Sequence, residues 1–285
     1  MNIIMISDFN LSQSGGGAQV SNDLIIKEGV RRGHDIVLHN YNGSPVNMLR
    51  DYDMLISSNL EAAYRENRST LDFIVGHPNH VRLEHDSCLY LETQDRVNLF
   101  QSSRLNFFLS GFHLDYFKSM YGDMFGETKI VYDPIDVALF KPNPDTPKIY
   151  DVVYCGLIHE LKGVGELIEF SDKNKHRMID VFGWSSVGDE LLFANHDNIT
   201  FHGSIPHKEM PKLFQSCNSV FHNPVVNEPF CRMVAEAILC GVDDFIGTPE
   251  KIGSLLEYRK HGLDEFKTNC SNASIQFWEA LEATL

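Results

Sequence analysis

The sequence predicts an α/β protein made of two doubly wound parallel sheets. Short apolar runs alternate with helix-like stretches along the whole chain, which is typical of parallel sheets covered by helices on both faces. The alternation stops once, at residues 134–147, where four prolines occur within fourteen residues. Neither a helix nor a central strand tolerates so much proline, so this stretch is expected to be a linker. It separates a predicted first domain, residues 1–140, from a predicted second domain, residues 148–285.

The first domain is expected to open with a strand and a helix. The apolar run NIIMIS begins the chain, and the helical pattern GAQVSNDLIIKEGVRRG at 17–33 follows it. Further short apolar runs predict the other strands of a parallel sheet. These runs are DIVLHN, DMLISS, DFIVGH, VRLEH, LNFFLS and KIVYD, at 35–40, 53–58, 72–77, 81–85, 105–110 and 129–133.

The alternation restarts after the linker and continues to the last residues. The expected strands are DVVYCG, MIDVFG, NITFHG, NSVFHNP and DDFIG, and the expected helices lie near 163–173, 207–216, 230–240 and 249–258. The final stretch, ASIQFWEALEATL, has an amphipathic pattern, so a helix there can dock on the second domain or cross back to the first. Its candidate apolar face consists of Ile275, Phe277, Trp278, Ala280, Leu281 and Leu285.

The composition describes a globular protein and limits its partners. The 285 residues are 43% hydrophobic and 22% charged, which is enough apolar material for a large core. The formal net charge is −15, and both halves are acidic: residues 1–146 hold 12 basic and 19 acidic side chains, and residues 147–285 hold 12 and 20. Nucleic acid is therefore not an expected partner.

A cytoplasmic location is expected. The opening MNIIMISDF has no basic region and is too short for a secretory signal, and no later apolar segment has the length that spans a bilayer. The six cysteines lie far apart without CxxC pairs, which favours structural thiols over a disulfide framework or a zinc site. They are Cys88, Cys155, Cys217, Cys231, Cys240 and Cys270.

Ligands of open α/β sheets bind at the carboxyl ends of the strands, and the first motif in such a place is SDFNLSQSGGGAQV. Gly15, Gly16 and Gly17 lead from a strand into a helix. Glycine lets the backbone approach a ligand, and amides at a helix N-terminus attract an anion such as a diphosphate. The spacing fits neither a dinucleotide-binding GxGxxG nor a P-loop. A flexible turn is the alternative.

The second motif is VRLEHDSCLY, in which His85 and Asp86 come directly after a predicted strand. A histidine there can bind a sugar hydroxyl or move a proton, with the carboxylate setting its tautomer. His77 and His80 compete for this role, and an ordinary core or surface histidine is the alternative for each.

The third motif combines CGLIHELKGVGELIEF with NEPFCRMVAEAILCGV. Lys162 follows the first strand of the second domain and can face a phosphate. Glu228 precedes a helix in whose first turn Pro229 would fit, and Arg232 and Glu236 lie one turn apart on that helix. Two carboxylates beside phosphate-binding groups suit a ligand with many hydroxyls, such as a sugar on a diphosphate. A surface Arg–Glu pair with a capping glutamate is the alternative.

Together these stretches resemble the retaining glycosyltransferases of family 4. That family has a Glu-Pro-Phe-Gly turn, a second glutamate eight positions after the first, and a Cys-Gly end, and the chain has EPFCRMVAEAILCG at 228–241. IVYDPIDVALFKP at 130–142 resembles the interdomain crossing, CGLIHELKG the phosphate loop, and residues 198–224 the segment beside the nucleobase. The resemblance covers most of the chain. It implies the GT-B fold, in which two Rossmann-like domains face each other across a cleft.

The resemblance also implies roles for individual residues. Glu228 would contact the donor sugar, Glu236 would hold the ribose hydroxyls, and Lys162 would bind the diphosphate, alone or with Arg232. The amides of Phe230 and Cys231 would face the sugar. The remaining implied site residues are Gly16 and Gly17 at the diphosphate and His85 near the sugar or acceptor, with His85 and Glu228 as the catalytic pair.

Two positions depart from the family pattern. Leu157 stands where the phosphate loop often carries arginine, and Cys231 stands where the turn usually carries glycine. The cysteine side chain is expected to narrow the sugar pocket.

The activity implied is transfer of a sugar from a nucleotide diphosphate sugar, such as a UDP- or GDP-sugar, to an acceptor hydroxyl with anomeric retention. No cofactor or metal is expected, because amides, Lys162 and a helix end would neutralise the leaving diphosphate. The acceptor, whether glycan, lipid-linked sugar or protein, stays open. The alternatives are a nucleotide-sugar epimerase or hydrolase of the same fold and a non-catalytic nucleotide-sugar-binding scaffold.

Overall fold

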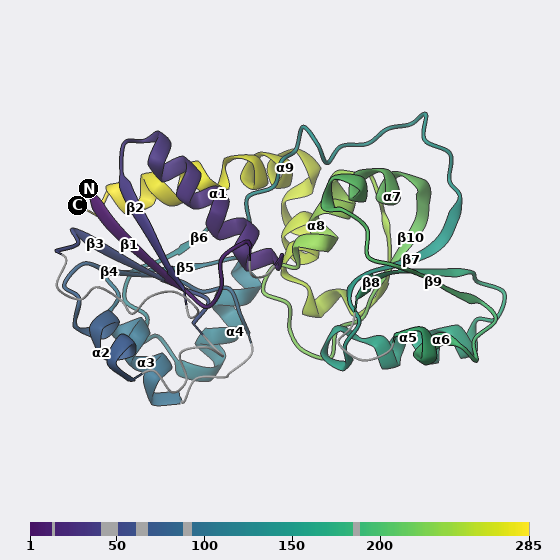
Figure 1. The fold of residues 1–285 in the computed structure, drawn as a ribbon, viewed down its shortest axis with the longest axis horizontal. Helices are drawn as coiled ribbons and strands as arrows, with labels where there is room; N and C mark the ends of the chain where they lie inside the picture. Colours follow the sequence, from purple (N-terminus) through teal and green to yellow (C-terminus); the bar gives the residue numbers. More distant parts are fainter. Residues whose placement is uncertain (13–14, 41–50, 61–67, 88–92, 185–188, 285) are drawn as a thin grey trace. The chain divides into compact units, whose positions relative to one another are not determined.

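The computed structural model describes residues 1–12, 15–40, 51–60, 68–87, 93–184 and 189–284. The chain divides into two compact units. Unit 1 combines Met1–Pro134 with Thr268–Leu285, and unit 2 is Ile135–Lys267. Each unit contains one parallel sheet with helices on both of its faces (Figure 1). The prediction of an α/β protein with two parallel sheets is confirmed.

Unit 1 contains a six-stranded parallel sheet in the order β2-β1-β3-β4-β5-β6. In Figure 1, α1 and the end of α9 cover one face of this sheet, and α2, α3 and α4 cover the other. The strands are β1 (Asn2–Ser7), β2 (Asp35–Asn40), β3 (Met54–Ser58), β4 (His80–Leu83), β5 (Leu105–Phe108) and β6 (Thr128–Ile130). The helices are α1 (Gly17–Arg31), α2 (Arg68–Gly76), α3 (Thr93–Ser102) and α4 (Gly111–Tyr121).

The prediction of a strand at 72–77 is wrong, because residues 72–76 belong to α2 and His77 follows that helix. Thr70, Leu71 and Ile74 are buried at the spacing of one helix face. Leu71 and Ile74 pack in a core cluster with Leu55 of β3 and Leu99 of α3. A short apolar run does not by itself distinguish a strand from a buried helix turn, and packing decides between them here.

Unit 2 contains a five-stranded parallel sheet in the order β11-β10-β7-β8-β9, with α7 and α8 on one face and α5 and α6 on the other (Figure 1). The five strands occur where the sequence predicts them. They are β7 (Tyr150–Leu157), β8 (Ile179–Trp184), β9 (Ile199–Gly203), β10 (Cys217–His222) and β11 (Asp244–Gly247). The helices are α5 (Val164–Lys173), α6 (Asp189–Phe193), α7 (Met210–Ser216), α8 (Arg232–Leu239) and α9 (Gly253–Glu282).

The final helix, α9, belongs to both units. It is kinked at Gly262, whose φ of 77° lies in the left-handed region, and its last part packs in unit 1. Trp278 is fully buried there, and its indole N–H donates to the carbonyl of Ile25, 2.8 Å away. Phe277 lies with its ring centroid 4.5 Å from that of Phe107. The amphipathic pattern at the C-terminal end therefore supplies core residues to the first sheet.

Gly29 allows α1 to approach α9 closely, which gives a first prediction. A β-carbon at Gly29 would lie 2.2 Å from Cζ2 of Trp278 and 2.5 Å from Cδ1 of Ile36. Gly29→Ala is expected to lower the free energy of unfolding by about 1–3 kcal/mol, because a packed core does not accept the methyl group without shifts. Gly76→Ala is the matched control, since its β-carbon would meet nothing within 4 Å. Urea unfolding compares the two, and equal stabilities would contradict the packing argument.

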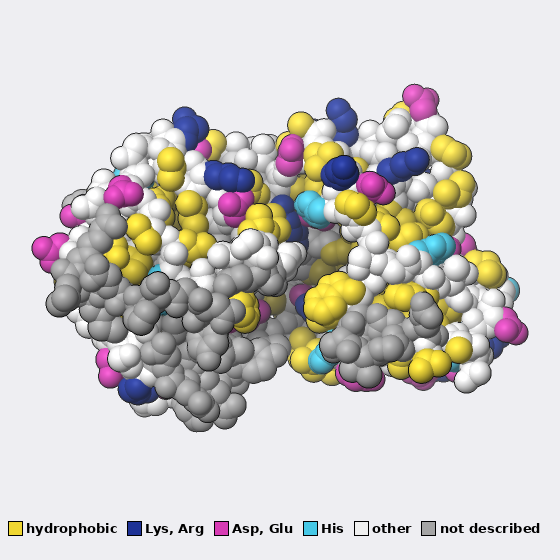
Figure 2. Space-filling model, in the orientation of Figure 1, with side chains coloured by type: hydrophobic (Ala, Val, Ile, Leu, Met, Phe, Trp, Pro, Cys, Tyr) yellow, Lys and Arg dark blue, Asp and Glu magenta, His cyan; other side chains and the backbone are white. Residues whose placement is uncertain are grey.

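On the face drawn in Figure 2, the Lys and Arg side chains of the residues that the structure describes lie singly or in small groups among acidic and hydrophobic ones. Among the described residues, none of the helices combines the length and the apolar character needed to cross a membrane.

Candidate functional site

The candidate site of unit 2 lies where the strand order of its sheet reverses. β8 and β9 follow on one side of β7, and β10 and β11 lie on the other. Such a switch point leaves a crevice at the carboxyl ends of the two central strands, where open α/β sheets bind ligands. Lys162 comes after β7, His222 ends β10, and Glu228 comes after β10.

The loop after β7 places Lys162 beside Glu228. A short 3-10 helix, Glu160–Lys162, is followed by Gly163, whose φ of 86° is left-handed. A β-carbon at Gly163 would lie 2.1 Å from the carbonyl oxygen of Asn223, so only glycine fits between the two loops. Nζ of Lys162 donates to Oε1 of Glu228 over 2.6 Å. The lysine side chain is 39% exposed and the glutamate side chain 11%.

The backbone of Glu228 is fixed on both sides. Its N–H donates to the carbonyl of Lys251, and its own carbonyl accepts from the N–H of Gly253. Burial would raise the pKa of Glu228, but the charge of Lys162 and the hydrogen bond with His222 outweigh it and lower the pKa to about 2. The carboxylate is therefore ionised and held in place at neutral pH.

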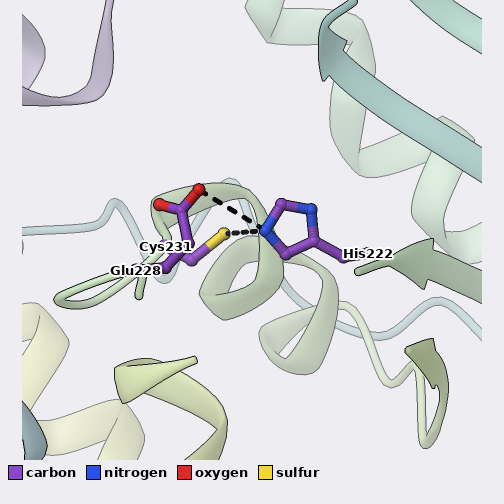
Figure 3. Close-up of side chains that lie close together, drawn as sticks. All are labelled: His222, Glu228 and Cys231. Carbon is purple, nitrogen blue, oxygen red and sulfur yellow. Dashed lines mark hydrogen bonds and ion pairs between the residues drawn. The ribbon is translucent and has the colours of Figure 1, made fainter. Parts of the chain in front are cut away.

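His222 and Cys231 complete a cluster around Glu228 (Figure 3). Sγ of Cys231 lies 3.2 Å from Nε2 of His222, and that nitrogen lies 3.7 Å from Oε1 of Glu228. Burial alone would lower the pKa of His222, but Cys231 and Glu228 overcome this effect and raise it to about 10. The cluster thus combines a thiol, an imidazole and a carboxylate whose nearest donor atoms all lie within 4.8 Å of one another.

Cys231 has a left-handed backbone, with φ 64° and ψ 82°. This conformation is uncommon for residues with a β-carbon and suits glycine, the residue that the resembling family carries at this position. α8 begins directly after it, at Arg232. The prediction that Pro229 lies in the first turn of this helix is therefore wrong, because the turn of residues 228–231 precedes the helix.

Glu236 lies on α8, one turn after Arg232, and is 2% exposed. Its Oε1 accepts from Nε of Arg232 over 3.0 Å and lies 2.9 Å from Nε2 of His207. The Arg232 side chain is only 10% exposed, so the alternative of a surface ion pair is wrong. Two nitrogen groups hold this carboxylate in a fixed position.

Phe230 contributes its ring to the core rather than to a ligand surface. It is 1% exposed and stacks with Phe266 at a centroid distance of 6.1 Å. Its carbonyl accepts from the N–H of Ser254. The ring thereby anchors the turn that carries Glu228 and Cys231.

In unit 1 the corresponding switch point lies between β1 and β3. Gly16 caps α1 with an extended backbone, φ −68° and ψ 162°, and Gly17 is the first residue of the helix. Gly16 has no side chain to cap this end of α1. The predicted loop after β1 therefore does lead into a helix N-terminus, where partial positive charge is concentrated.

His85 lies two residues after β4 and is 6% exposed. Its Nε2 lies 3.2 Å from Oδ1 of Asn22 in α1, and its Nδ1 lies 3.8 Å from Oδ1 of Asp133. Burial lowers the pKa of His85, and Asp133 offsets this only in part, so the imidazole is neutral at pH 7. Asn22 also binds the hydroxyls of Ser7 and Ser58, at the carboxyl ends of β1 and β3.

The two competing histidines lie away from the carboxyl edge of this sheet. His80 is the first residue of β4, is fully buried, and contacts the hydroxyls of Ser57 and Ser102 at 2.7 and 2.8 Å. His77 follows α2 and lies with Nε2 3.2 Å from the carbonyl oxygen of Tyr52. Both have structural partners, so of these three histidines His85 is the one at the carboxyl end of the sheet.

The structure brings Lys162, Glu228 and Cys231 together. Arg232 begins α8 directly after Cys231, and Glu236 lies one turn further along that helix. Gly16, Gly17 and His85 belong to unit 1. Sequence reasoning overlooked residues that hold these groups. For His222 a signal existed, because it follows an apolar run as His85 does, whereas the contacts of the others depend on the fold. The overlooked residues are His222, His207, Asn22 and Asp133.

Comparison with known proteins finds similar structures, but no protein-family model matches the chain and no curated protein matches its sequence. A structure of HepE from Anabaena in complex with UDP-glucose matches with a TM-score of 0.68 at 19% identity, covering 100% of this chain and 99% of that one. A sucrose-phosphate synthase from Thermosynechococcus elongatus matches with a TM-score of 0.69 at 13% identity, covering 99% and 94%.

A third similar structure is an α-glucosyltransferase in complex with UDP and a 13-mer DNA that contains an HMU base. It matches with a TM-score of 0.61 at 12% identity, covering 97% of this chain and 95% of that one. Identities of this size establish a common fold and leave the activity to be argued from the site. The two parallel sheets, the helices between their strands and the coverage of the whole chain together show that this protein has the GT-B fold of these glycosyltransferases.

Proposed function

We propose that the protein transfers a sugar from a UDP-sugar to an acceptor hydroxyl, with retention of the anomeric configuration and without a metal ion in the transfer step. The observation that carries this proposal is the contact of Lys162 with Glu228 at the switch point of unit 2. Glu236, held by Arg232 and His207, provides the second carboxylate of the same loop and helix. UDP is favoured as the nucleotide because HepE and the α-glucosyltransferase were both crystallised with UDP or UDP-glucose.

In this proposal Lys162 turns from Glu228 to the diphosphate when the donor binds. Its side chain is partly exposed, so the ammonium can move without unpacking the core. A positive charge near the leaving diphosphate stabilises the charge that develops as the bond to the sugar breaks. Glu228 accepts hydrogen bonds from sugar hydroxyls, and Glu236 accepts those of the ribose.

Retention is proposed to follow from attack on the face that the diphosphate leaves. The departing diphosphate takes the proton of the acceptor hydroxyl, so the enzyme needs no nucleophile of its own and acts by placing the reactants. The amides at Gly16 and Gly17 assist at the diphosphate, and neutral His85 binds the sugar or the acceptor. The expected cytoplasmic location and a carbohydrate, lipid-linked or protein acceptor belong to the same proposal.

Thermal shift with nucleotides tests the donor site. UDP at about 100 times its dissociation constant is expected to stabilise the protein by about 2.7 kcal/mol, and so to raise its Tm, without added metal. GDP and ADP at the same concentration are expected to raise it less. Glu236→Ala is expected to remove the shift, because the ribose loses its acceptor.

Glu169→Ala serves as the control, since Glu169 is exposed and pairs with Lys173 in the same helix. If no nucleoside diphosphate shifts the Tm at millimolar concentration, the donor site is refuted. Binding of UDP-sugar with no product from any acceptor would favour a scaffold, and release of free sugar would favour a hydrolase.

A further inference from the structure

We propose that His222, Glu228 and Cys231 form a binding site for a thiophilic divalent cation such as Zn²⁺, and that an ion bound there inhibits sugar transfer. The three residues contribute an imidazole nitrogen, a carboxylate oxygen and a sulfur, all within 4.8 Å of one another (Figure 3). The sequence favoured structural thiols, and Cys231 is the half-exposed one among Cys155, Cys217, Cys231, Cys240 and Cys270, the free cysteines of the described residues.

The distances between the donor atoms suit tetrahedral zinc. Zinc lies about 2.3 Å from a cysteine sulfur and about 2.0–2.2 Å from histidine nitrogen or carboxylate oxygen. Tetrahedral angles then separate the ligand atoms by roughly 3.3–3.6 Å. Two of the observed separations, 3.2 Å for sulfur to nitrogen and 3.7 Å for nitrogen to oxygen, are close to these values. The third, sulfur to oxygen, lies within 4.8 Å, so side-chain rotations can bring the three ligand atoms around one ion.

The surrounding backbone holds the three ligands in place before an ion arrives. His222 ends β10, where a β-carbon on Gly247 of β11 would lie 2.1 Å from the carbonyl oxygen of His222, so the two strands pack closely there. Glu228 is fixed by backbone hydrogen bonds on both sides. The left-handed backbone of Cys231 sets the direction of its thiol. Preformed ligands lose little conformational entropy when they bind an ion.

The ligand types determine which ions fit. Sulfur and imidazole favour zinc and similar transition metals, whereas magnesium and calcium prefer sites made only of oxygen. The cluster therefore differs from an oxygen-ligand site that would hold a diphosphate through Mg²⁺. With three protein ligands, the fourth zinc position stays open to water or another small ligand. Zinc binds a neutral imidazole and a thiolate, so the ion displaces the proton of the His222 imidazolium and that of the Cys231 thiol, and both protons go to solvent.

Inhibition follows because the ion and the donor need the same carboxylate. Oxygen Oε1 of Glu228 lies 2.6 Å from Nζ of Lys162 and 3.7 Å from Nε2 of His222. An ion on this oxygen replaces the lysine and removes the carboxylate from the sugar. This consequence rests on the proposed function, whereas the binding of the ion does not.

Cobalt spectroscopy tests the binding directly. Co²⁺ titrated into the reduced, metal-free protein is expected to give one equivalent of bound ion, with visible d–d bands and a near-ultraviolet sulfur-to-cobalt charge-transfer band. Zn²⁺ is expected to displace it. Cys231→Ser should lose the charge-transfer band, and His222→Gln should weaken Co²⁺ binding at least about tenfold, in line with the loss of one ligand.

The controls are Cys270→Ala and His261→Gln, which change a buried thiol and a half-exposed imidazole elsewhere in the chain. Both are expected to keep the bands of the unaltered protein. Cys231→Gly is a second variant for the site, because glycine suits the left-handed backbone and should fold well. If no charge-transfer band forms, or if it survives in Cys231→Ser and Cys231→Gly, the proposed site is refuted.

A second measurement distinguishes binding of the ion from inhibition of sugar transfer by that ion. Zn²⁺ is expected to reduce the UDP-dependent thermal shift and any transfer rate in the unaltered protein, and to reduce neither in Cys231→Gly relative to its own metal-free value. A cobalt spectrum without a nucleotide shift would leave the metal site standing and refute the transferase. Cobalt binding at Cys231 with an unchanged UDP shift would overturn the inhibitory role.

Discussion

Glu228→Gln is expected to lower the rate of sugar transfer by about 10²–10³-fold, the range typical of losing one preorganised polar group in an active site. Glutamine has nearly the same size, but it is neutral and places a donor where the carboxylate offered two acceptor oxygens. It also removes the negative charge that faces the ammonium of Lys162 at 2.6 Å. Steady-state kinetics with a UDP-sugar donor measures the change in kcat.

The contrast with Glu236→Gln sharpens this prediction. Glu236 is proposed to bind ribose, so its replacement should raise the Kd for UDP about tenfold or more, while Glu228→Gln should change that Kd much less. His85→Gln is expected to lower kcat as Glu228→Gln does, without loss of UDP affinity. Glu169→Gln is the exposed control in unit 2. Equal and small effects in all the site variants would contradict the assignment of roles.

The second large effect is expected in unit 1, where Glu84→Gln should lower the free energy of unfolding by about 3–5 kcal/mol. Arg82 and Glu84 are both 0% exposed, and Nη2 of the arginine lies 2.7 Å from Oε2 of the glutamate. Removal of the carboxylate leaves a guanidinium charge in the core with less compensation. Chemical unfolding of the whole chain measures the loss.

Asp72→Asn provides the comparison for an exposed pair. Asp72 and Arg68 have side chains 65% and 59% exposed, so breaking their contact should cost less than about 1 kcal/mol. If Glu84→Gln also lowers the free energy of unfolding by less than about 1 kcal/mol, the buried ion pair contributes little beyond the packing of its side chains.

The stabilisation by Glu84 also depends on pH. Burial would raise the pKa of Glu84, but the charges of Arg82 and Arg96 outweigh it and lower the pKa from 4.5 to about 2. Because the folded-state pKa lies below the unfolded-state value, the contribution is complete above pH 4.5 and is lost as the pH falls toward about 2. The difference between Glu84→Gln and the unaltered chain should shrink over that interval.

The sequence predicts the fold well where periodicity and chain order determine it. The run at residues 3–6 of β1 is buried on both faces and appears in the sequence as a continuous hydrophobic stretch, so its strand is found without difficulty. The segment 72–77 has the same local appearance but forms a helix, since its partners in α3 and β3 are known only once the chain is folded. The local pattern there favours a strand, whereas the tertiary packing favours the helix that the structure contains.

The candidate site shows the same limit. The motif at 228–236 identifies the carboxylates, and chain order places Lys162 near them, because both follow central strands of one sheet. His222 meets Cys231, and His207 meets Glu236, because the chain between the two members of each pair turns back on itself. The sequence does not give the geometry of those turns. Motif spacing therefore identifies the residues that would bind a ligand. It does not identify the residues, such as His222 and His207, that hold those ligand-binding side chains in place.

The course of α9 has a consequence for how the chain folds during synthesis. Unit 2 is continuous in sequence, whereas unit 1 needs the segment after Lys267 to fill its core with Phe277 and Trp278. Ribosomes add about 5–20 residues per second, so the first 134 residues wait roughly 7–30 seconds for this segment. Unit 2 can complete its core first. The N-terminal unit emerges first but is the last to mature, and in the interval its uncovered apolar face is the part of the nascent chain that chaperones would protect.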